Sequence, residues 1–257
     1  MNKDKIGIII PVHNLWHHYT KPLIMSIKEA GNAFLEEAEY HVYIVDNASE
    51  DDTKTEGILL STANPLFTYI RNSANLGCSP AWNQGIREAI KDDCNYFLIL
   101  NNDILIHPNS INALLERFDK KDVGMVTMMD LKGELTKPES LHSVSPNNKN
   151  HVDEAPHPNF SAFMLSKEAY DIVGEFDENF APAYFEDNDY HYRMKINNLK
   201  AITYPRAMFY HYGSRTQNES EPQPIVNGAL FERNRGYYQK KWGGNPGSET
   251  FTKPFNQ

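Results

Sequence analysis

The chain has 257 residues, of which 40% are hydrophobic and 23% charged, and its formal net charge at pH 7 is −9. This composition excludes a largely disordered chain, and the negative charge argues against a partner bound mainly through its phosphate backbone. Cys78 and Cys94 are the only cysteines and have no metal-like spacing, which argues against a disulfide framework and favours a reducing compartment. The N-terminal apolar run is too short for a signal peptide, and no apolar stretch reaches the ~20 residues that span a bilayer. We therefore expect no transmembrane segment and a cytoplasmic location.

Strand-like apolar runs alternate with helical patterns in the first half of the chain. Strands are predicted at 6–12, 41–47, 67–72, 96–103 and 123–129, and helices at 21–30, 50–60, 79–90 and 111–118. The helix at 79–90 has a favourable start, because Ser79 is a good N-cap residue and Pro80 suits the first helical position. Helices between strands act as crossover connections. The pattern predicts an α/β fold with a Rossmann-like, mostly parallel central sheet flanked by helices.

The second half is less regular. Residues 132–158 are rich in Pro, Asn, Ser and His, which indicates a long loop of the kind that is usually functional or mobile. After it, the patterns predict order at 160–166, a helical turn at 167–173, a helix at 186–196, short strands at 201–205 and 207–211, and a final helix at 225–242.

Polar residues follow three of the predicted strands. The first strand is followed by His13 and Asn14, the second ends at Asp46, and the fourth ends in the run from Asn101 to Asp103. A single Asp or Asn at a strand end often only forms a turn. However, in open parallel sheets ligands bind outside the carboxyl ends of the strands. Three polar ends at the same edge therefore predict one binding site.

Six motifs carry a family resemblance. In chain order they are IIIPVHN, VDNASEDDT, NLGCSPAWNQGI, LILNND, YFEDNDYHYRM and YHYGSRT. Their order and spacing resemble the family 2 nucleotide-sugar glycosyltransferases of GT-A fold, from residue 6 to about 242, with the loop at 132–158 left unmatched. The resemblance implies one GT-A domain over residues 1–242 and a C-terminal tail at 243–257. Within the domain, about 6–103 would bind the nucleotide sugar and about 104–242 would bind the acceptor.

The resemblance assigns the donor to residues at the strand ends and in the turn before the 79–90 helix. The implied substrate-binding residues are Pro11, Val12, Asn14, Asp46, Asn75, Gly77, Asn101 and Asn102. Asp46 would accept a hydrogen bond from the base, which for uracil is the N3–H, so a UDP sugar is favoured. Asn75 and Gly77 would form the turn around the nucleoside, where glycine permits a close backbone approach.

A divalent cation is also implied. Asp103 ends the run that stands where the family carries its Asp-x-Asp motif, and it would bind the cation that bridges the two donor phosphates. His211 would be a further metal ligand. Carboxylate, imidazole and phosphate oxygens together suit Mn²⁺, with Mg²⁺ as the alternative. Asn101 replaces the first Asp of the motif, which removes one formal charge from the site.

Glu186 and Asp187 form an acidic pair at the start of a predicted helix, where negative charge also suits the helix dipole. The resemblance implies that Asp187 is the general base that deprotonates the acceptor hydroxyl, and that Glu186 contacts the acceptor or supports the start of the helix. Asp189 and Arg193 are interpreted as structural ion-pair partners on the helix surface.

The resulting prediction is an inverting, metal-dependent glycosyltransferase that moves a sugar from a nucleoside-diphosphate sugar to an acceptor hydroxyl. The acceptor stays open between a glycan, a lipid-linked molecule, a protein and a modified nucleic acid. A nucleotidyltransferase is one alternative, although residues 11–16 lack the Gly-rich basic loop usual for that class. A catalytically weak sugar-binding domain derived from the GT-A fold is the other, and Asn101 is the feature that favours it.

Overall fold

The computed structural model describes residues 3–34, 38–131, 135, 137–145, 153–154, 157–213, 215–219 and 228–257. The strands are β1 (Asp4–Val12), β2 (Ala38–Asp46), β3 (Phe67–Arg71), β4 (Tyr96–Leu100), β5 (Ile104–Ile106), β6 (Val123–Asp130), β7 (Asp153–Glu154), β8 (Ala162–Ser166) and β9 (Lys200–His211). The helices are α1 (Lys21–Phe34), α2 (Thr53–Ala63), α3 (Cys78–Lys91), α4 (Ser110–Leu115), α5 (Lys167–Val173), α6 (Glu186–Ile196), α7 (Arg215–Glu219) and α8 (Gly228–Trp242). Shorter turns are η1 (Trp16–Thr20), η2 (Pro138–Ser143), η3 (Glu178–Phe180) and η4 (Pro254–Asn256).

A nine-stranded sheet forms the centre, with strand order β3-β2-β1-β4-β8-β6-β9-β5 and β7 paired to β9. The pairs β1–β2, β1–β4, β2–β3 and β6–β9 are parallel. The strand β8 runs antiparallel to both β4 and β6, and β5 and β7 run antiparallel to β9. The α/β class is as predicted. The predicted parallel arrangement holds for the first four strands, whereas the whole sheet is mixed.

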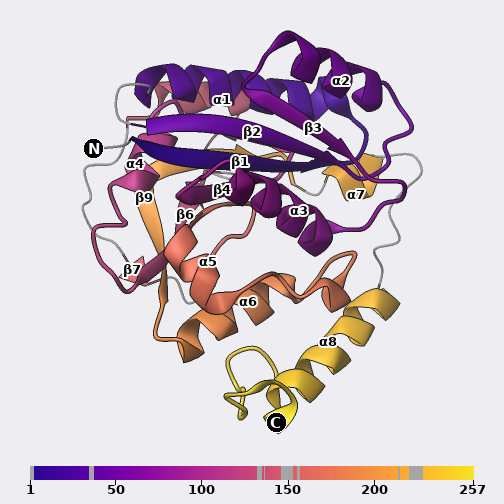
Figure 1. The fold of residues 1–257 in the computed structure, drawn as a ribbon, viewed down its shortest axis with the longest axis vertical. Helices are drawn as coiled ribbons and strands as arrows, with labels where there is room; N and C mark the ends of the chain where they lie inside the picture. The colour runs from indigo at the N-terminus through magenta and orange to yellow at the C-terminus, as the bar shows by residue number, and fades with distance from the viewer. Residues whose placement is uncertain are drawn as a thin grey trace.

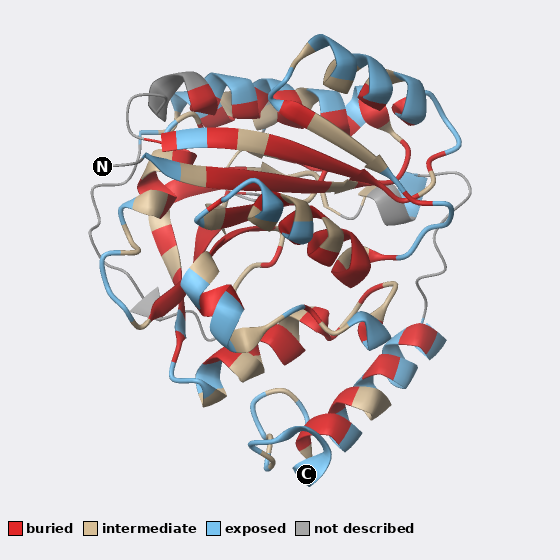
Figure 2. Ribbon diagram, in the orientation of Figure 1, coloured by how far each residue is buried: buried red, intermediate tan, exposed pale blue. Residues whose placement is uncertain are grey.

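Both faces of the sheet are covered, and this explains the continuous apolar run of β1. Ile8 and Ile10 pack in one core with α1, while Ile9 packs in the other core with Trp82 and Ile86 of α3. Figure 1 shows α1 and α2 on one side of the sheet and α3, α5 and α6 on the other. Figure 2 shows the central strands buried and the outward faces of these helices exposed.

Two strand predictions needed correction. The strand predicted at 96–103 ends at Leu100, and the chain then turns so that β5 pairs with β9 instead of continuing β4. The short strands predicted at 201–205 and 207–211 are one strand, β9. The register of β9 on β6 shifts between Tyr204 and Met208, so Pro205 lies in a bulge, where its missing N–H breaks no regular ladder bond.

The start of α3 also differs from the prediction. Gly77, and not Ser79, occupies the N-cap position, and the Ser79 hydroxyl has no hydrogen-bond partner among the described residues. Gly77 has φ of 87°, and a Cβ there would clash with the backbone of Pro182. The Cys78 N–H donates to the Pro182 carbonyl at 2.9 Å. This close approach ties the first turn of α3 to the segment that precedes α6.

Asp189 is fully buried, so the prediction that places it on the helix surface is wrong. It accepts from the Arg193 Nε at 2.8 Å and the Trp242 Nε1 at 2.8 Å, and it lies 2.6 Å from the Lys241 Nζ. Lys241 also pairs with Asp177 at 2.7 Å. The ion pair predicted with Arg193 is therefore part of a buried network that fastens α8 to α6, below the sheet in Figure 1.

The remaining segments bear on two predictions. Residues 243–257 fold back on α8, since the N–H groups of Thr250 and Phe251 both donate to the Trp242 carbonyl at 3.0 Å. Within the loop predicted at 132–158, η2 and β7 are described, and most of the rest lies outside the described residues, as do residues 225–227 of the predicted final helix. In the described part of the chain, no helix combines the length and apolar character needed to cross a bilayer.

Candidate active site

Six strands end at one edge of the sheet. The strands β2 and β3 run parallel to β1. Because β8 is antiparallel to both β4 and β6, β6 runs in the same direction as β4 and β1, and β9 runs parallel to β6. The carboxyl ends that meet at this edge are therefore Val12, Asp46, Arg71, Leu100, Asp130 and His211. The three strand ends predicted to meet do lie at one edge, and the structure adds the ends of β3, β6 and β9 to it.

The pairing of β5 with β9 brings Asp103 and His211 together. Ile104 is opposite His211 in the antiparallel register, so the residue before β5 lies beside the end of β9. The Asp103 Oδ1 lies 3.3 Å from the His211 Nε2, and its Oδ2 accepts the Arg215 N–H at 2.9 Å. Burial favours a higher pKa for Asp103, but the hydrogen bonds and charge that it receives from His211 and Arg215 hold its pKa below the ordinary value. Asp103 is thus an ionised, nearly buried carboxylate.

This pair fits a divalent cation. Two neighbouring ligands of an octahedral ion, each about 2.1 Å from the metal, lie about 3 Å apart, close to the spacing of the Asp103 and His211 atoms. Among the described residues, no group of three or more His, Cys, Asp or Glu could hold a metal. A cation bound here would consequently take most of its ligands from the donor phosphates and water.

Asp130 is a site residue that the sequence interpretation missed. Its Oδ2 lies 4.0 Å from the His211 Nδ1, on the other side of the ring from Asp103. This is an ion-pair spacing, longer than a hydrogen bond, so Asp130 adds a carboxylate charge beside the ring. The signal was present, since Asp130 directly follows the strand predicted at 123–129.

Asp46 is fully buried and saturated with hydrogen bonds. Its Oδ1 accepts from the Ser49 N–H at 2.8 Å and the Ser49 hydroxyl at 2.6 Å, while its Oδ2 accepts from the Tyr69 hydroxyl and the Arg71 guanidinium. A carboxylate offers about four acceptor positions. A base N–H would have to displace one of these partners to reach Asp46, and the Arg71 side chain is 30% exposed.

The residues after β1 connect two loops at the edge. Val12 is buried and Pro11 partly exposed, and the Asn14 side-chain oxygen accepts the Glu50 N–H at 2.7 Å. The Asn14 N–H donates to the Ser49 hydroxyl at 2.7 Å. Asn14 has φ of 58°, a conformation that asparagine tolerates better than most residues. Its side chain thus holds the β1 and β2 ends together.

The other predicted donor residues are spread along the same edge. Asn75 is exposed, and its Oδ1 accepts the Gly77 N–H at 3.1 Å, which shapes the turn before α3. Asn101 is partly exposed and its N–H donates to the Ser161 carbonyl at 2.9 Å. Asn102 is buried, with its Nδ2 3.4 Å from a hydroxyl of η1. Of the two asparagines before Asp103, Asn101 is therefore the more accessible.

Glu186 and Asp187 begin α6 in a partly dehydrated environment. Glu186 is 8% exposed, and its Oε2 has no hydrogen-bond partner among the described residues. Burial, and then the charge of Asp187, raise the pKa of Glu186 to about 8. Burial also raises the pKa of Asp187, which is partly exposed. At neutral pH the pair holds a proton on Glu186, which limits the repulsion between the two side chains.

Cys78, at the start of α3, is influenced both by Glu186 and Asp187 and by Asp103, the predicted metal ligand. Burial raises the pKa of the Cys78 thiol far above its ordinary value, and the charges of Glu186, Asp187 and Asp103 raise it further. All three carboxylates are therefore near enough to the first residue of α3 to act on its thiol electrostatically. The structure thus brings the predicted metal ligand Asp103 and the predicted catalytic pair into one region, although they are more than 80 residues apart in sequence.

Comparison with known proteins gives the family and the fold. Residues 7–170 match the model of the family described as glycosyl transferase family 2. The chain belongs to this family. A comparison with curated proteins gives no match. The predicted enzyme class, family and α/β GT-A fold of this glycosyltransferase are confirmed.

Two solved structures are similar to this transferase. One is the mannosyltransferase PcManGT from Pyrobaculum calidifontis in complex with GDP-Man and Mn²⁺, with TM-score 0.63, 17% identity, and coverage of 82% of this chain and 57% of that one. The other is GalNAc-T7 with UDP, GalNAc and Mn²⁺, with TM-score 0.70, 15% identity, and coverage of 93% of this chain and 49% of that one. This chain thus spans about half the length of these two proteins.

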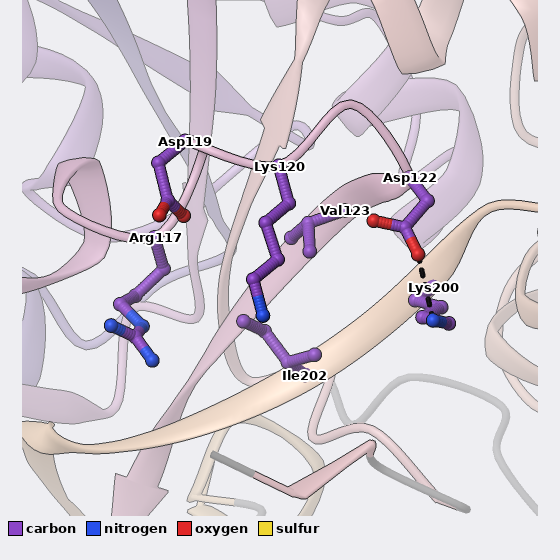
Figure 3. A pocket seen from close by; sticks show the side chains of 7 residues that line it. All are labelled: Arg117, Asp119, Lys120, Asp122, Val123, Lys200 and Ile202. Carbon is purple, nitrogen blue, oxygen red and sulfur yellow. Dashed lines mark ion pairs between the residues drawn. The ribbon is translucent and has the colours of Figure 1, made fainter. Parts of the chain in front are cut away.

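A cavity of about 210 Å³ lies at the opposite edge of the sheet of this transferase, beside the first residues of β6 and β9 (Figure 3). Its lining consists of Arg117, Asp119, Lys120, Asp122, Val123, Lys200 and Ile202. Lys200 is paired with Asp122 at 2.7 Å. None of the predicted site residues lines this cavity, so it is separate from the candidate active site.

Proposed function

We propose that this family 2 transferase is an inverting, metal-dependent enzyme that uses a nucleoside-diphosphate sugar, with UDP as the favoured nucleotide, and an acceptor hydroxyl. One observation carries the proposal: Asp103 is paired with His211 at the edge where the strands end, and Asp103, Glu186 and Asp187 all act electrostatically on Cys78 at the start of α3. The Mn²⁺ and nucleotide ligands named for the two similar structures support it.

Asp103 and His211 would hold the divalent cation, Mn²⁺ or Mg²⁺, with the Asp130 carboxylate beside the His211 ring. When bound, such an ion stabilises the negative charge that develops on the leaving nucleoside diphosphate. Asp103 suits this role because its neighbours hold its pKa below the ordinary value, so the carboxylate is ionised although it is buried. Asn75, which is exposed, would contact the nucleoside, and Asn101, which is partly exposed, would contact the ribose.

Asp187 would act as the general base. The acceptor oxygen forms a bond to the anomeric carbon while the bond from that carbon to the phosphate oxygen breaks, and the acceptor proton passes to the Asp187 carboxylate. A single displacement of this kind inverts the configuration at the anomeric carbon. Burial raises the pKa of Asp187, which makes its carboxylate a stronger base. Glu186, with its pKa at about 8, stays protonated at neutral pH and leaves the base role to Asp187.

The central test is the Asp187→Asn substitution. It keeps the size of the side chain but removes the proton acceptor, so we expect kcat to fall by about 10²–10⁴-fold with donor affinity nearly intact. Asp171→Asn on the exposed face of α5 is a suitable control, whereas Asp189→Asn is not, because Asp189 is buried with Lys241. A variant with near-normal turnover and a melting temperature lowered by a few degrees would show that Asp187 only supports the helix.

The choice of UDP rests on Asp46 at the end of β2. A uracil N3–H can replace the Arg71 or Tyr69 donor on the Asp46 Oδ2, and thymine presents the same edge. Thermal-shift titration with UDP, dTDP and GDP in the presence of Mn²⁺ checks this. We expect the largest shift with UDP, and stabilisation by GDP alone would contradict the proposed preference.

A further inference from the structure

Aromatic side chains gather around the segment that leads into Glu186 and Asp187. Phe231, on the first turn of α8, is 40% exposed, and Tyr184 is partly exposed. Their ring centroids are 5.4 Å apart in an edge-to-face arrangement. Phe185 is buried and supports Phe231 from the other side, with centroids 5.1 Å apart. Large apolar rings that stay exposed beside a candidate active site commonly mark a binding surface.

The backbone under this surface is strained. Tyr184 and Phe185 have φ of 80° and 72°, in the left-handed region that bulky residues rarely adopt. Such a conformation costs about 1–3 kcal/mol per residue and persists only where the surroundings enforce it. Two consecutive strained residues directly before the catalytic pair indicate that the direction of these side chains serves a function.

Asn234 of α8 enforces the strained conformation. It is fully buried, and its amide Nδ2 donates to the carbonyls of Phe180 at 2.6 Å, Ala183 at 2.8 Å and Tyr184 at 3.0 Å, sharing two hydrogens among three acceptors. The Arg233 guanidinium donates to a further carbonyl, that of Ala181. The helix that carries Phe231 therefore also fixes Tyr184, so both rings belong to one rigid unit.

The surface is within reach of the proposed base. Tyr184 precedes Asp187 by three residues, so their Cα atoms are at most about 11 Å apart. A ring seated on Tyr184 and Phe231 could therefore present a hydroxyl toward Asp187.

We propose that Tyr184 and Phe231 form an acceptor platform that binds a sugar ring, so that this enzyme extends a saccharide. The inference rests on the proposed function and names its acceptor class. Aromatic faces bind the apolar C–H face of a sugar ring while the ring hydroxyls keep their contacts with water. An alkyl chain would need a longer apolar groove, but most of the other exposed large apolar side chains, such as Met25, Leu59 and Ile172, lie on α1, α2 and α5. Leu76, directly before Gly77, is an exception.

The test uses the full chain, Mn²⁺ and UDP sugars, and measures UDP release with and without a panel of methyl glycosides and disaccharides. We expect at least one saccharide to increase the release above donor hydrolysis. Phe231→Ala should raise the KM for that saccharide at least tenfold and lower transfer more than it lowers hydrolysis. Phe231→Leu, which keeps apolar packing without a ring, should share the KM defect, and Phe231→Tyr should restore binding. Phe255→Ala is the control, because Phe255 is equally exposed, at 44%, on the C-terminal turn.

The outcomes separate the two proposals. If Phe231→Leu and Tyr184→Ala keep the normal KM for the saccharide, the rings only pack α8 against the preceding segment and the acceptor platform is wrong. If the enzyme hydrolyses a donor but no saccharide increases the release, the saccharide acceptor is likewise overturned while the proposed function stands. Failure of the unmodified chain to hydrolyse any donor would count against the proposed function itself.

Discussion

Replacing Glu186 by glutamine should make the protein more stable at alkaline pH. The folded state holds a proton on Glu186 up to about pH 8, whereas the unfolded chain loses it near the ordinary pKa of 4.5. Between these values the folded state binds more protons, so the free energy of unfolding falls as the pH rises. The contribution of the bound proton is thus complete below about pH 4.5 and is lost by about pH 8. The neutral amide side chain of the Glu186→Gln variant has no such dependence.

The size of the effect follows from the burial of Glu186. The difference between 4.5 and about 8 corresponds to at most about 5 kcal/mol. Half of that amount would raise the melting temperature of a domain of this size by roughly 5–10 °C. At pH 5 the Glu186 carboxyl of the folded parent protein is protonated, and the glutamine that replaces it is also neutral. The melting temperatures of the two proteins should therefore differ little at this pH.

Melting curves of both proteins from pH 5 to pH 9 measure this directly. Glu168→Gln, at an exposed position in the first turn of α5, is the matched control and should give a difference in melting temperature that does not vary with pH. A constant or shrinking difference between Glu186→Gln and the parent protein would refute the reasoning, because it would show that Glu186 is ionised in the folded state at neutral pH.

Three further substitutions have distinct expected outcomes. Asp103→Ala should abolish the Mn²⁺-dependent part of UDP binding in calorimetry, and turnover of the unmodified enzyme should stop in excess EDTA; full activity with the chelator would contradict a metal role. Gly77→Ala should lower the free energy of unfolding in urea by more than about 1–2 kcal/mol, the cost of the left-handed backbone alone, because its Cβ also meets Pro182. Asp189→Asn should cost about 3–5 kcal/mol in the same assay, since Lys241 loses a buried partner, while donor binding per folded molecule stays normal.

The sequence predicted the parts of the fold that depend on local patterns. Apolar periodicity predicted the first four strands and the start of α6 at Glu186. The rule that ligands bind at the carboxyl ends of parallel strands predicted that the polar strand ends lie together. The motifs gave the family, which the match over residues 7–170 confirmed. The predicted donor, catalytic and metal roles stay predictions that the substitutions above would test.

The errors came from contacts between distant segments. The turn-forming residues from Asn101 to Asp103 mark a break after Leu100 but do not show where the chain goes next, because β5 forms only by pairing with β9, which comes much later in the chain. Serine is a favourable N-cap residue, so the sequence pointed to Ser79. The N-cap is instead residue 77, where the close approach of Pro182 requires a glycine. Asp189 resembled a surface residue because its buried partners, Lys241 and Trp242, lie on the distant helix α8.

The late position of β9 in the chain has a consequence for folding. Asp103 and His211 meet only through the β5–β9 pairing, and closing a loop of this length is a slow, entropically costly step. The β3-β2-β1-β4 unit can pair without β9, so the predicted metal site would be completed after much of the sheet has formed. The appearance of Mn²⁺ affinity during refolding would then report the docking of the last strand. A chain that stops before residue 200 should retain the segments proposed to contact the nucleotide and lack the metal response.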